Sequence, residues 1–259
     1  MRCLYRETIY QAGDYMDVSI FPVYKKSGQR SRKAKPTSEV QQKLNMINSK
    51  NNLIRICNAN FTDRDFEVTL TYRPECFPEN DESAMKELRN FLRRFKNYRS
   101  RNGLEDLKYV AVTEKGKRSG KYHHHLIVNG GFEPRDIVKL WGLGIVQFKS
   151  LQFDTDGIAA LVRYITKDPI GTKKKWTSSK NLVHPKPVMR NGRITKRIAL
   201  ELAKDTTNSA NYEKLYPDYF FSSANKLIND FNGGVYVHAR FYRKENAKKC
   251  GMLRKRPKA

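Results

Sequence analysis

Three of the protein's five histidines stand in a row, at His123, His124 and His125. The apolar run 126–128 follows them, so residues 122–129 are predicted to form a β-strand. Side chains alternate between the two faces of a strand, which puts His123 and His125 on one face and His124 on the other. Two imidazoles on one face, with Cα atoms about 6–7 Å apart, can close on a single metal ion.

A carboxylate precedes this strand at a useful spacing. Glu114 ends another alternating stretch, residues 107–114, and the loop 115–121 between the two strands contains two glycines. In a hairpin closed by this loop, Glu114 lies opposite or diagonal to His123 and His125 on the same face. One carboxylate and two imidazoles form a three-ligand site with open positions, which suits Mg²⁺ or Mn²⁺ holding a phosphate. Alternatively, the histidines only pack or bind phosphate.

A candidate nucleophile lies further along the chain. Residues 156–167 show apolar positions at helical spacing, and we expect Asp154 or Thr155 to cap this helix. Tyr164 and Lys167 lie three residues apart and flank the apolar stripe on one side. A tyrosine can attack a phosphodiester, but its free phenol has a pKa of about 10 and needs activation by a metal or by positive charge. Lys167 is placed to supply that charge. On this helix alone, an ordinary amphipathic helix with a rim tyrosine and a solvated lysine is the favoured interpretation.

The elements that must position these groups follow a recognisable order. From residue 66 we predict strands and helices alternating as β-α-β-β-α-β-α: 66–72, 80–99, 107–114, 122–129, 134–141, 145–149 and 156–167. This is the split βαβ order of a ferredoxin-like sheet with one helix added. The sequence therefore predicts an α+β fold with a ferredoxin/RRM-like central antiparallel sheet, helices on one face, and the other face open to a ligand.

This predicted core, residues 51–170, is flanked by two extensions. Residues 1–50 are expected to be a basic N-terminal extension, with an edge strand at 17–24, an exposed basic loop at 25–35 and a short helix within 37–50. Residues 53–57 are predicted to form a short strand. Residues 171–259 are expected to be a basic C-terminal region, with a helix at 194–204, a strand at 235–242 and a disordered tail from 244.

Composition points to a polyanionic partner. The chain of 259 residues carries 51 Lys and Arg against 26 Asp and Glu, a net charge of +25 that is spread along its whole length. Such a field favours nucleic acid, although a ribosomal-type or merely soluble basic protein would also show it. The candidate DNA contacts are Lys121, Arg163, Lys173, Lys174, Lys175 and Trp176.

Several other classes are disfavoured. The four cysteines show no CxxC spacing, which argues against a zinc ribbon or a disulfide framework and suits a reducing cytosol. No apolar run approaches the roughly 18–20 residues of a membrane span, and the start lacks an apolar signal core, so we expect neither membrane insertion nor secretion. No GxxxxGK[ST] motif is present, so a helicase motor of that type is not expected.

Three segments together resemble the motifs of HUH endonucleases: Phe66-Glu-Val-Thr-Leu-Thr-Tyr72, then Glu114 ahead of Gly120-Lys-Tyr-His-His-His-Leu-Ile127, then Arg163-Tyr-Ile-Thr-Lys167. In particular, they resemble replication initiators (Rep proteins) of rolling-circle phages, single-stranded DNA viruses and plasmids. The resemblance covers roughly residues 53–169. His124 departs from the pattern, because the position between the two histidines is usually hydrophobic.

The resemblance implies roles for individual residues. His123 and His125 match the metal histidines and Glu114 the third ligand, with Mg²⁺ or Mn²⁺ as cofactor. Tyr164 matches the nucleophile and Lys167 its assisting lysine, and the absence of a second tyrosine on this helix implies a single-tyrosine enzyme. The first motif is expected to be a structural strand near the DNA.

The implied function is nicking and rejoining of single-stranded origin DNA through a 5′-phosphotyrosyl intermediate. The implied partners are origin DNA, a host helicase and a host DNA polymerase. We expect a monomer or weak oligomer associated with DNA in the host cytoplasm. The alternatives are a plasmid relaxase or mobilisation protein, and a non-catalytic RRM-like binding module. Such a module would usually carry aromatic residues where the histidines stand.

Overall fold

The computed structural model describes residues 4–24, 39–116, 119–167, 170, 175–229 and 234–247. The chain divides into two compact units. The central unit comprises Asn60–Gln152 and Ile158–Val183, and the terminal unit comprises Met1–Ala59, Phe153–Gly157 and His184–Ala259. Most of the two expected extensions thus belongs to one unit, whereas residues 171–183 belong to the central unit. The expected loop at 25–35, and most of the expected tail, lie outside the described residues.

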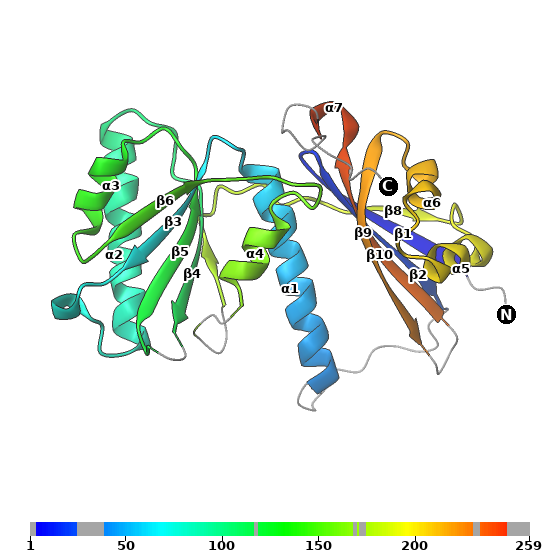
Figure 1. Ribbon diagram of the computed structural model, residues 1–259, viewed down its shortest axis with the longest axis horizontal. Coiled ribbons are helices and arrows are strands. Elements are labelled where there is room, and N and C mark those ends of the chain that lie inside the picture. The colour runs from blue at the N-terminus through cyan, green and yellow to red at the C-terminus, as the bar shows by residue number, and fades with distance from the viewer. Residues whose placement is uncertain are drawn as a thin grey trace, which may run out of the picture. The chain divides into compact units, whose positions relative to one another are not determined.

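The central unit is built on a five-stranded antiparallel sheet, shown in Figure 1. Its strands are β3 (Phe66–Thr71), β4 (Tyr109–Lys115), β5 (Tyr122–Val128), β6 (Val146–Ser150) and β7 (Thr177–Ser178), in the spatial order β6-β3-β5-β4-β7. The first four form the split βαβ arrangement that the sequence predicted. The α+β class and the ferredoxin-like sheet are therefore confirmed. The short β7, within the expected basic C-terminal region, extends the sheet beside β4.

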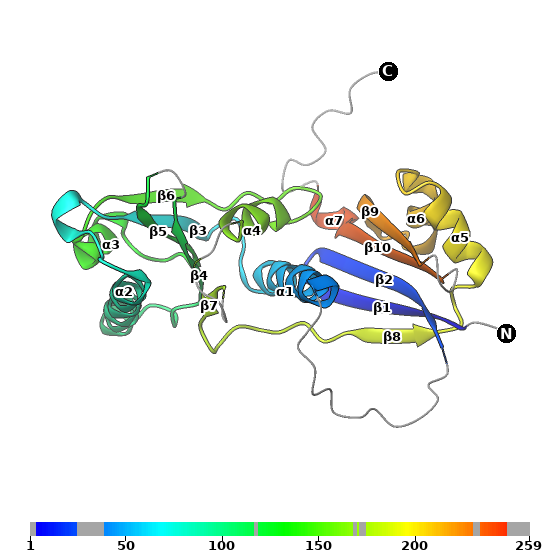
Figure 2. The ribbon, with the colours of Figure 1, turned by 90° about the horizontal axis from the view of Figure 1, so that it is seen from below.

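Two helices cover one face of this sheet, as Figures 1 and 2 show. They are α2 (Asp81–Arg101) and α3 (Pro134–Trp141). Asn80 caps α2 in a capping box. Its side chain accepts a hydrogen bond from the Ser83 backbone N–H, and the Ser83 hydroxyl accepts one from the Asn80 backbone N–H. Two backbone N–H groups that have no partner within the helix are thereby hydrogen-bonded. The helix α3 ends at Gly142, whose φ of 65° only glycine adopts cheaply.

The core of the central unit lies between this helical layer and the sheet. Leu88, Phe91 and Phe95 of α2 and Trp141 of α3 pack against inward-facing strand residues such as Leu70. On the other face of the sheet, polar side chains such as Thr69 and His125 stand beside buried apolar ones such as Val112.

The third helix of this unit starts later than predicted. The helix α4 spans Ala159–Ile165, and Ile158 at its N-cap makes no side-chain capping bond. Asp154, one of the two expected caps, instead pairs backbone to backbone with Gly157 in a tight turn. The predicted cap is wrong because this turn uses the first residues of the expected helix. A bend at Lys167 follows the helix, and Pro169, expected to end it, lies outside the described residues.

The terminal unit is built on a second antiparallel sheet, in the order β8-β1-β2-β10-β9. These strands are β1 (Leu4–Ala12), β2 (Tyr15–Val23), β8 (Val188–Asn191), β9 (Tyr219–Asn229) and β10 (Gly234–Arg243). The helices α5 (Lys196–Lys204) and α6 (Ser209–Leu215) cover one face, and α7 (Lys244–Ala247) follows β10. The expected helix at 194–204 and strand at 235–242 are confirmed.

Three predictions for the terminal unit are wrong. The tail expected to be disordered from residue 244 begins with the helix α7. The strand expected at the edge, β2, lies between β1 and β10. Pro22 is tolerated there because the β10 pairing of β2 ends at Ile20, so Pro22 pairs only with β1 among the described strands. Residues 53–57 are not a strand but the buried end of the helix α1 (Glu39–Asn60). A short apolar run fits either structure, and here it prolongs a helix.

No helix among the described residues combines the length and the apolar character needed to cross a bilayer.

Candidate active site

The β4–β5 hairpin sets the positions of the central polar side chains. Glu114 pairs directly with His123 in the register, and His125 pairs with Val112, so Glu114 lies diagonal to His125 on the same face. The connecting turn is held by a hydrogen bond from the Gly116 N–H to the Lys121 carbonyl, and Gly120 takes a φ of 64° there. The arrangement expected from strand alternation is observed.

His124 faces the opposite way, into the core. Its Nδ1 lies 2.8 Å from the Thr113 hydroxyl and its Nε2 lies 2.6 Å from the Tyr72 hydroxyl. Its ring packs edge-on against Tyr72 and Trp141. Burial, and then the neighbouring imidazoles, lower the pKa of His124 to about 3, so the ring is neutral. The hydrophobic position of the motif is therefore filled here by a polar side chain whose two nitrogens both have partners.

The outward-facing side chains line one open pocket of about 330 Å³. It is formed by Glu67, Thr69, Thr71, Glu114, Gly116, His123, His125, Gln147, Lys149 and Tyr164. Four residues singled out in the sequence, Glu114, His123, His125 and Tyr164, thus meet at one place. They come from β4, β5 and α4, which shows why no local stretch contains the whole site.

His125 is the centre of this pocket. Its Nε2 lies 3.8 Å from a carboxylate oxygen of Glu114, and its Nδ1 lies 4.0 Å from one of Glu67 and 3.3 Å from the Thr69 hydroxyl. Burial, followed by the charges of His123 and Lys149, lowers the pKa of His125 to about 4. The imidazole is therefore neutral at physiological pH and has a lone pair to offer.

Glu67 is a pocket residue that the sequence reasoning missed. It lies on β3, in the segment expected to be purely structural, and is largely buried beside His125. Burial raises the pKa of its carboxyl, although Lys149 acts in the opposite direction. Its position on the polar face of an alternating strand, with Thr69 and Thr71, was the signal available in the sequence. Gln147 and Lys149 on β6 were missed in the same way.

Tyr164 reaches the pocket from α4. Its ring meets the His125 ring edge-on, with centroids 5.8 Å apart and an interplanar angle of 77°. The residue is 59% exposed. A phenol that lies against an imidazole and is also open to solvent can be approached by a large substrate.

The spacing of the candidate ligand atoms can be compared with the spacing found around a bound metal ion. Across the described parts of the chain, no three His, Cys, Asp or Glu side chains are already gathered as a metal cluster. Ligand atoms that share an ion at about 2.0–2.2 Å are roughly 3–4.4 Å apart. The 3.8 Å between His125 and Glu114 falls in this range, and His123 lines the same pocket. The neutral imidazole of His125 and the Glu114 carboxylate are therefore spaced as two ligands of one divalent ion would be.

The remaining predicted residues lie elsewhere. Lys167 is exposed in the bend after α4, and neither it nor Arg163, Lys121, Lys175 or Trp176 belongs to the described pocket lining. Arg163 and Lys121 are exposed, whereas Lys175 and Trp176 are partly buried just before β7. Lys173 and Lys174 lie outside the described residues.

Comparison with known proteins bears on the same stretch of chain. Searches of curated proteins and of solved structures found no significant match. Residues 65–169, which contain β3 to α4 and all the pocket residues, match the family model for replication-associated proteins of the ORF2 type, a family of rolling-circle replication initiators in the HUH superfamily.

Proposed function

We propose that this protein is a rolling-circle replication initiator that nicks single-stranded origin DNA by tyrosine attack and later rejoins the strands. The observation that carries the proposal is the meeting of Tyr164 with His125, His123 and Glu114 in one open pocket. The family match supports the general role, and the pocket supports the chemistry.

In the proposed reaction, the Tyr164 oxygen attacks the scissile phosphorus and loses its proton. The bond from phosphorus to the 3′ oxygen breaks, and that oxygen leaves as a free 3′-OH while the 5′-phosphate stays on the tyrosine. The free 3′-OH primes synthesis by a host polymerase. Attack of a 3′-OH on the phosphotyrosine reverses the step and joins the strand. The covalent link conserves the energy of the broken bond, so no nucleotide triphosphate is consumed.

The other pocket residues have supporting roles in the proposal. Glu114, His123 and His125 would hold a divalent ion, Mg²⁺ or Mn²⁺, which supplies positive charge to the phosphate oxygens when bound. Lys149 adds a fixed positive charge to the lining of the pocket. Lys167, although outside the lining, lies one turn from Tyr164 and would assist the phenol or steady the phosphate when DNA is bound.

A covalent-trapping experiment tests this. The full-length chain is incubated with a random-sequence single-stranded DNA library and Mn²⁺ or Mg²⁺, and adducts that survive SDS are isolated. We expect a protein–DNA adduct whose DNA is attached at Tyr164, as mapped by mass spectrometry, and whose sequence reveals the nick site. Tyr164→Phe should abolish the adduct and leave DNA binding largely intact.

A matched variant controls for the loss of any phenol. Tyr98 lies on the helical side of the same unit and donates to Asp136, so Tyr98→Phe should keep full adduct formation. An adduct that persists in Tyr164→Phe would disprove the assignment of the nucleophile. Binding without any adduct under all metal conditions would favour the RRM-like binding module. A nick site within a conjugative transfer origin would indicate a relaxase.

The proposed partners are single-stranded origin DNA, a host helicase and a host polymerase. The proposed location is the host cytoplasm, in association with DNA, and the proposed form is a monomer or weak oligomer.

A further inference from the structure

A second cavity of the central unit lies away from the pocket just described. It is a groove of about 490 Å³ between α2 and the chain that runs from β7 to residue 181. Its lining residues are Arg89, Leu92, Arg93, Lys96, Asp106, Leu107, Tyr109, Ser178, Ser179, Lys180 and Asn181. We call it the α2 groove. The helix α2 packs on the sheet face opposite to His123 and His125, so this groove is a distinct feature.

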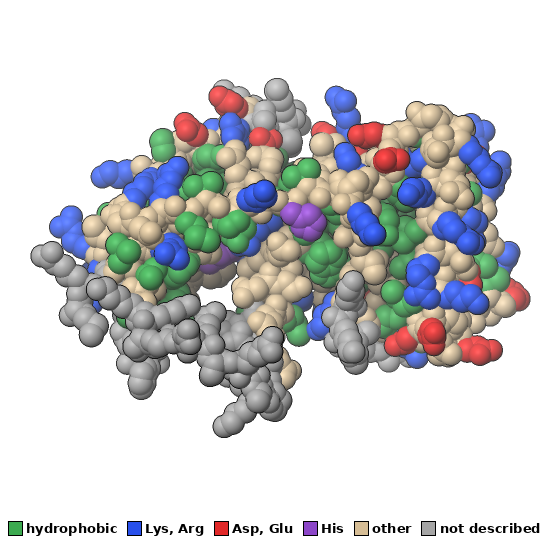
Figure 3. Space-filling view, turned by 180° about the vertical axis from the view of Figure 1, so that it is seen from behind, with side chains coloured by type: hydrophobic (Ala, Val, Ile, Leu, Met, Phe, Trp, Pro, Cys, Tyr) green, Lys and Arg blue, Asp and Glu red, His purple; other side chains and the backbone are tan. Residues whose placement is uncertain are grey.

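One wall of the groove is a row of cations. Arg89, Arg93 and Lys96 are spaced four and three residues apart on α2, which puts them on one helix face. At 1.5 Å per residue the row extends over about 10 Å. Lys180 adds a fourth cation from the facing segment. Positive charge is distributed widely on this protein, as the face in Figure 3 shows, but here it is concentrated along a concave surface.

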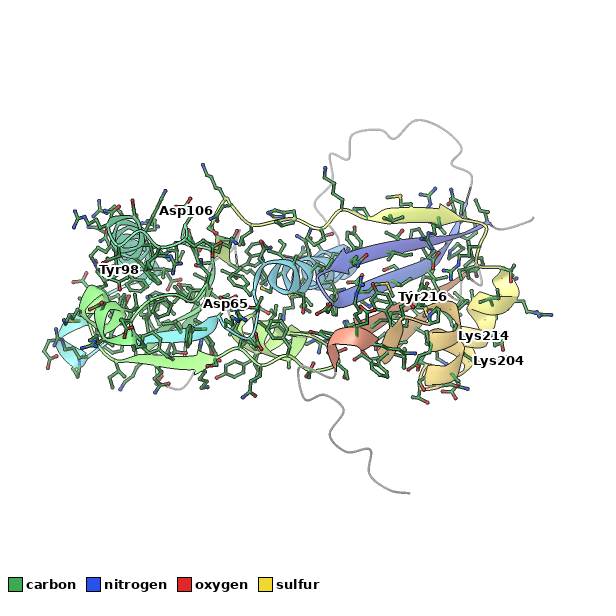
Figure 4. The ribbon with its side chains drawn as sticks, turned by 90° about the horizontal axis from the view of Figure 1, so that it is seen from above. Asp65, Tyr98, Asp106, Lys204, Lys214 and Tyr216 are labelled. Atoms are coloured by element: carbon green, nitrogen blue, oxygen red, sulfur yellow. The ribbon has the colours of Figure 1, made fainter. Side chains whose placement is uncertain are left out.

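The four cationic side chains of the groove are available to a ligand. Within the described residues, Arg89, Arg93, Lys96 and Lys180 make no ion pair or side-chain hydrogen bond. The lone carboxylate in the lining is Asp106, which lies beside the chain that leads away from β7 (Figure 4). Four cations against one anion leave an excess of positive charge that no protein group neutralises. Such an excess favours a polyanionic ligand.

The facing wall is fixed in place by backbone pairing. Ser178 pairs with Val110 of β4, and the Ser179 N–H donates to the Tyr109 carbonyl at 3.0 Å. The Tyr109 N–H donates in turn to the Ser179 hydroxyl at 3.1 Å. This segment presents hydroxyl and amide groups to the groove from a rigid frame, so binding there needs little reordering of the chain.

The floor of the groove is apolar and aromatic. Leu92, Leu107 and the half-buried ring of Tyr109 lie between the two walls. A duplex presents its phosphates outward and hides its bases, so it could use the cations but not this floor. A single strand offers both a phosphate backbone and unpaired bases. Grooves that combine cations with an aromatic platform are typical of single-strand binding.

We propose that the α2 groove is a second DNA-binding site that holds a segment of single-stranded DNA, with its phosphates along Arg89, Arg93 and Lys96 and a base against Tyr109. The site is separate from the pocket that contains Tyr164 and does not depend on the nicking chemistry. It would hold the strand outside the cleavage site.

Salt-dependent binding tests this without any cleavage. The anisotropy of a fluorescent oligo(dT) is measured with the full-length chain in EDTA at several salt concentrations. Each phosphate contact on a single strand contributes about 0.7 to the slope of log affinity against log salt. We expect Arg89→Gln with Arg93→Gln to lower the slope by about 1.4 and to weaken binding roughly tenfold at low salt.

The control removes two charges from the same unit outside the groove. Arg135 and Lys139 on α3 are exposed and do not line it, so Arg135→Gln with Lys139→Gln should change the slope much less. Equal changes in the two double variants would overturn the proposal. Tyr109→Leu should weaken binding roughly fivefold, whereas Tyr109→Phe should keep it. A duplex that competes as well as oligo(dT) would overturn the assignment to a single strand.

Discussion

Each of the two units sets a histidine against a carboxylate on the polar face of its sheet, but the two groups have different surroundings. In the terminal unit, His238 Nε2 lies 3.5 Å from Asp17, which is fully buried and also held by Arg55 at 2.7 and 2.8 Å. In the central unit, His125 lies 3.8 Å from Glu114 and 4.0 Å from Glu67, without a closer ion pair. We call the group of Asp17, Arg55 and His238 the closed group, because its carboxylate is buried and paired. The group around His125 lines an open pocket.

The pKa values of the two buried carboxyl groups, Asp17 and Glu67, shift in opposite directions. Burial alone would raise the pKa of Asp17, but the nearby His238 and the hydrogen bonds from Arg55 outweigh it and hold that pKa below its usual value. Glu67 has no comparable partner, and burial raises its pKa. A satisfied buried ion pair supports the fold, whereas polar groups left partly unsatisfied in a pocket remain available to a ligand. The same residue types therefore serve structure in one unit and, by our proposal, chemistry in the other.

The largest effect is expected from breaking the closed group. Arg55→Met leaves Asp17 buried without its bidentate partner, so we expect the free energy of unfolding to fall by about 3–5 kcal/mol. Urea denaturation followed by circular dichroism measures this loss. A loss below about 1 kcal/mol would mean that the ion pair is not structural and would remove the contrast between the two groups.

The next largest effect is expected at His124, whose substitution should differ in its result from that of the neighbouring His123. His124→Ala removes a buried ring, leaves the Tyr72 hydroxyl without its partner and leaves the Thr113 hydroxyl only its bond to the Met85 sulfur, so we expect a loss of about 2–4 kcal/mol in the free energy of unfolding. His123→Ala should cost less than about 0.5 kcal/mol but abolish metal-dependent adduct formation. Thermal unfolding and the covalent-trapping assay measure the two properties. Similar stability losses in both variants would contradict this division of roles.

Asp17 of the closed group should also make the stability of the protein depend on pH. The pKa of Asp17 is lower in the folded state than the usual value for an aspartate. Its stabilising contribution is therefore fully present above about pH 4 and is lost as the pH falls through the lower folded value. Unfolding measured from pH 7 to pH 2 should show a decline at the acid end that is shallower in Asp17→Asn. An unchanged acid limb in this variant would argue against the role of Asp17.

The smallest effect should come from the open pocket, and with the opposite sign. Because burial raises the pKa of Glu67, its charged form is disfavoured in the folded protein. Glu67→Gln keeps the shape of the side chain and removes the charge, so we expect a gain of about 0.5 kcal/mol or less at pH 7. Denaturant titration of the variant beside the parent chain measures the difference. A clear loss of stability would show that Glu67 is structurally paired.

Local signals in the sequence were reliable where the structure is itself local. The helices predicted at 80–99 and 134–141 and the alternation of β5 depend on neighbouring backbone and side-chain positions, and the structure shows them close to prediction. Errors came where two local structures compete for the same residues. The helix α4 begins later than predicted because the turn at 154–157 occupies the residues expected to start it. Residues 53–57 form the end of the long helix α1, although a short apolar run of this kind also fits a strand.

The sequence alone determined the order of elements in the central unit, and with it the face on which Glu114, His123 and His125 would lie, because strand alternation and hairpin register are properties of short segments. Only the tertiary structure decided that Glu67 and Lys149 share their pocket and that β1 and β2 pair with strands from the end of the chain. The α2 groove likewise exists only because β7 places residues 178–181 opposite α2. These features depend on contacts between residues far apart in the chain, and no local pattern encodes such contacts.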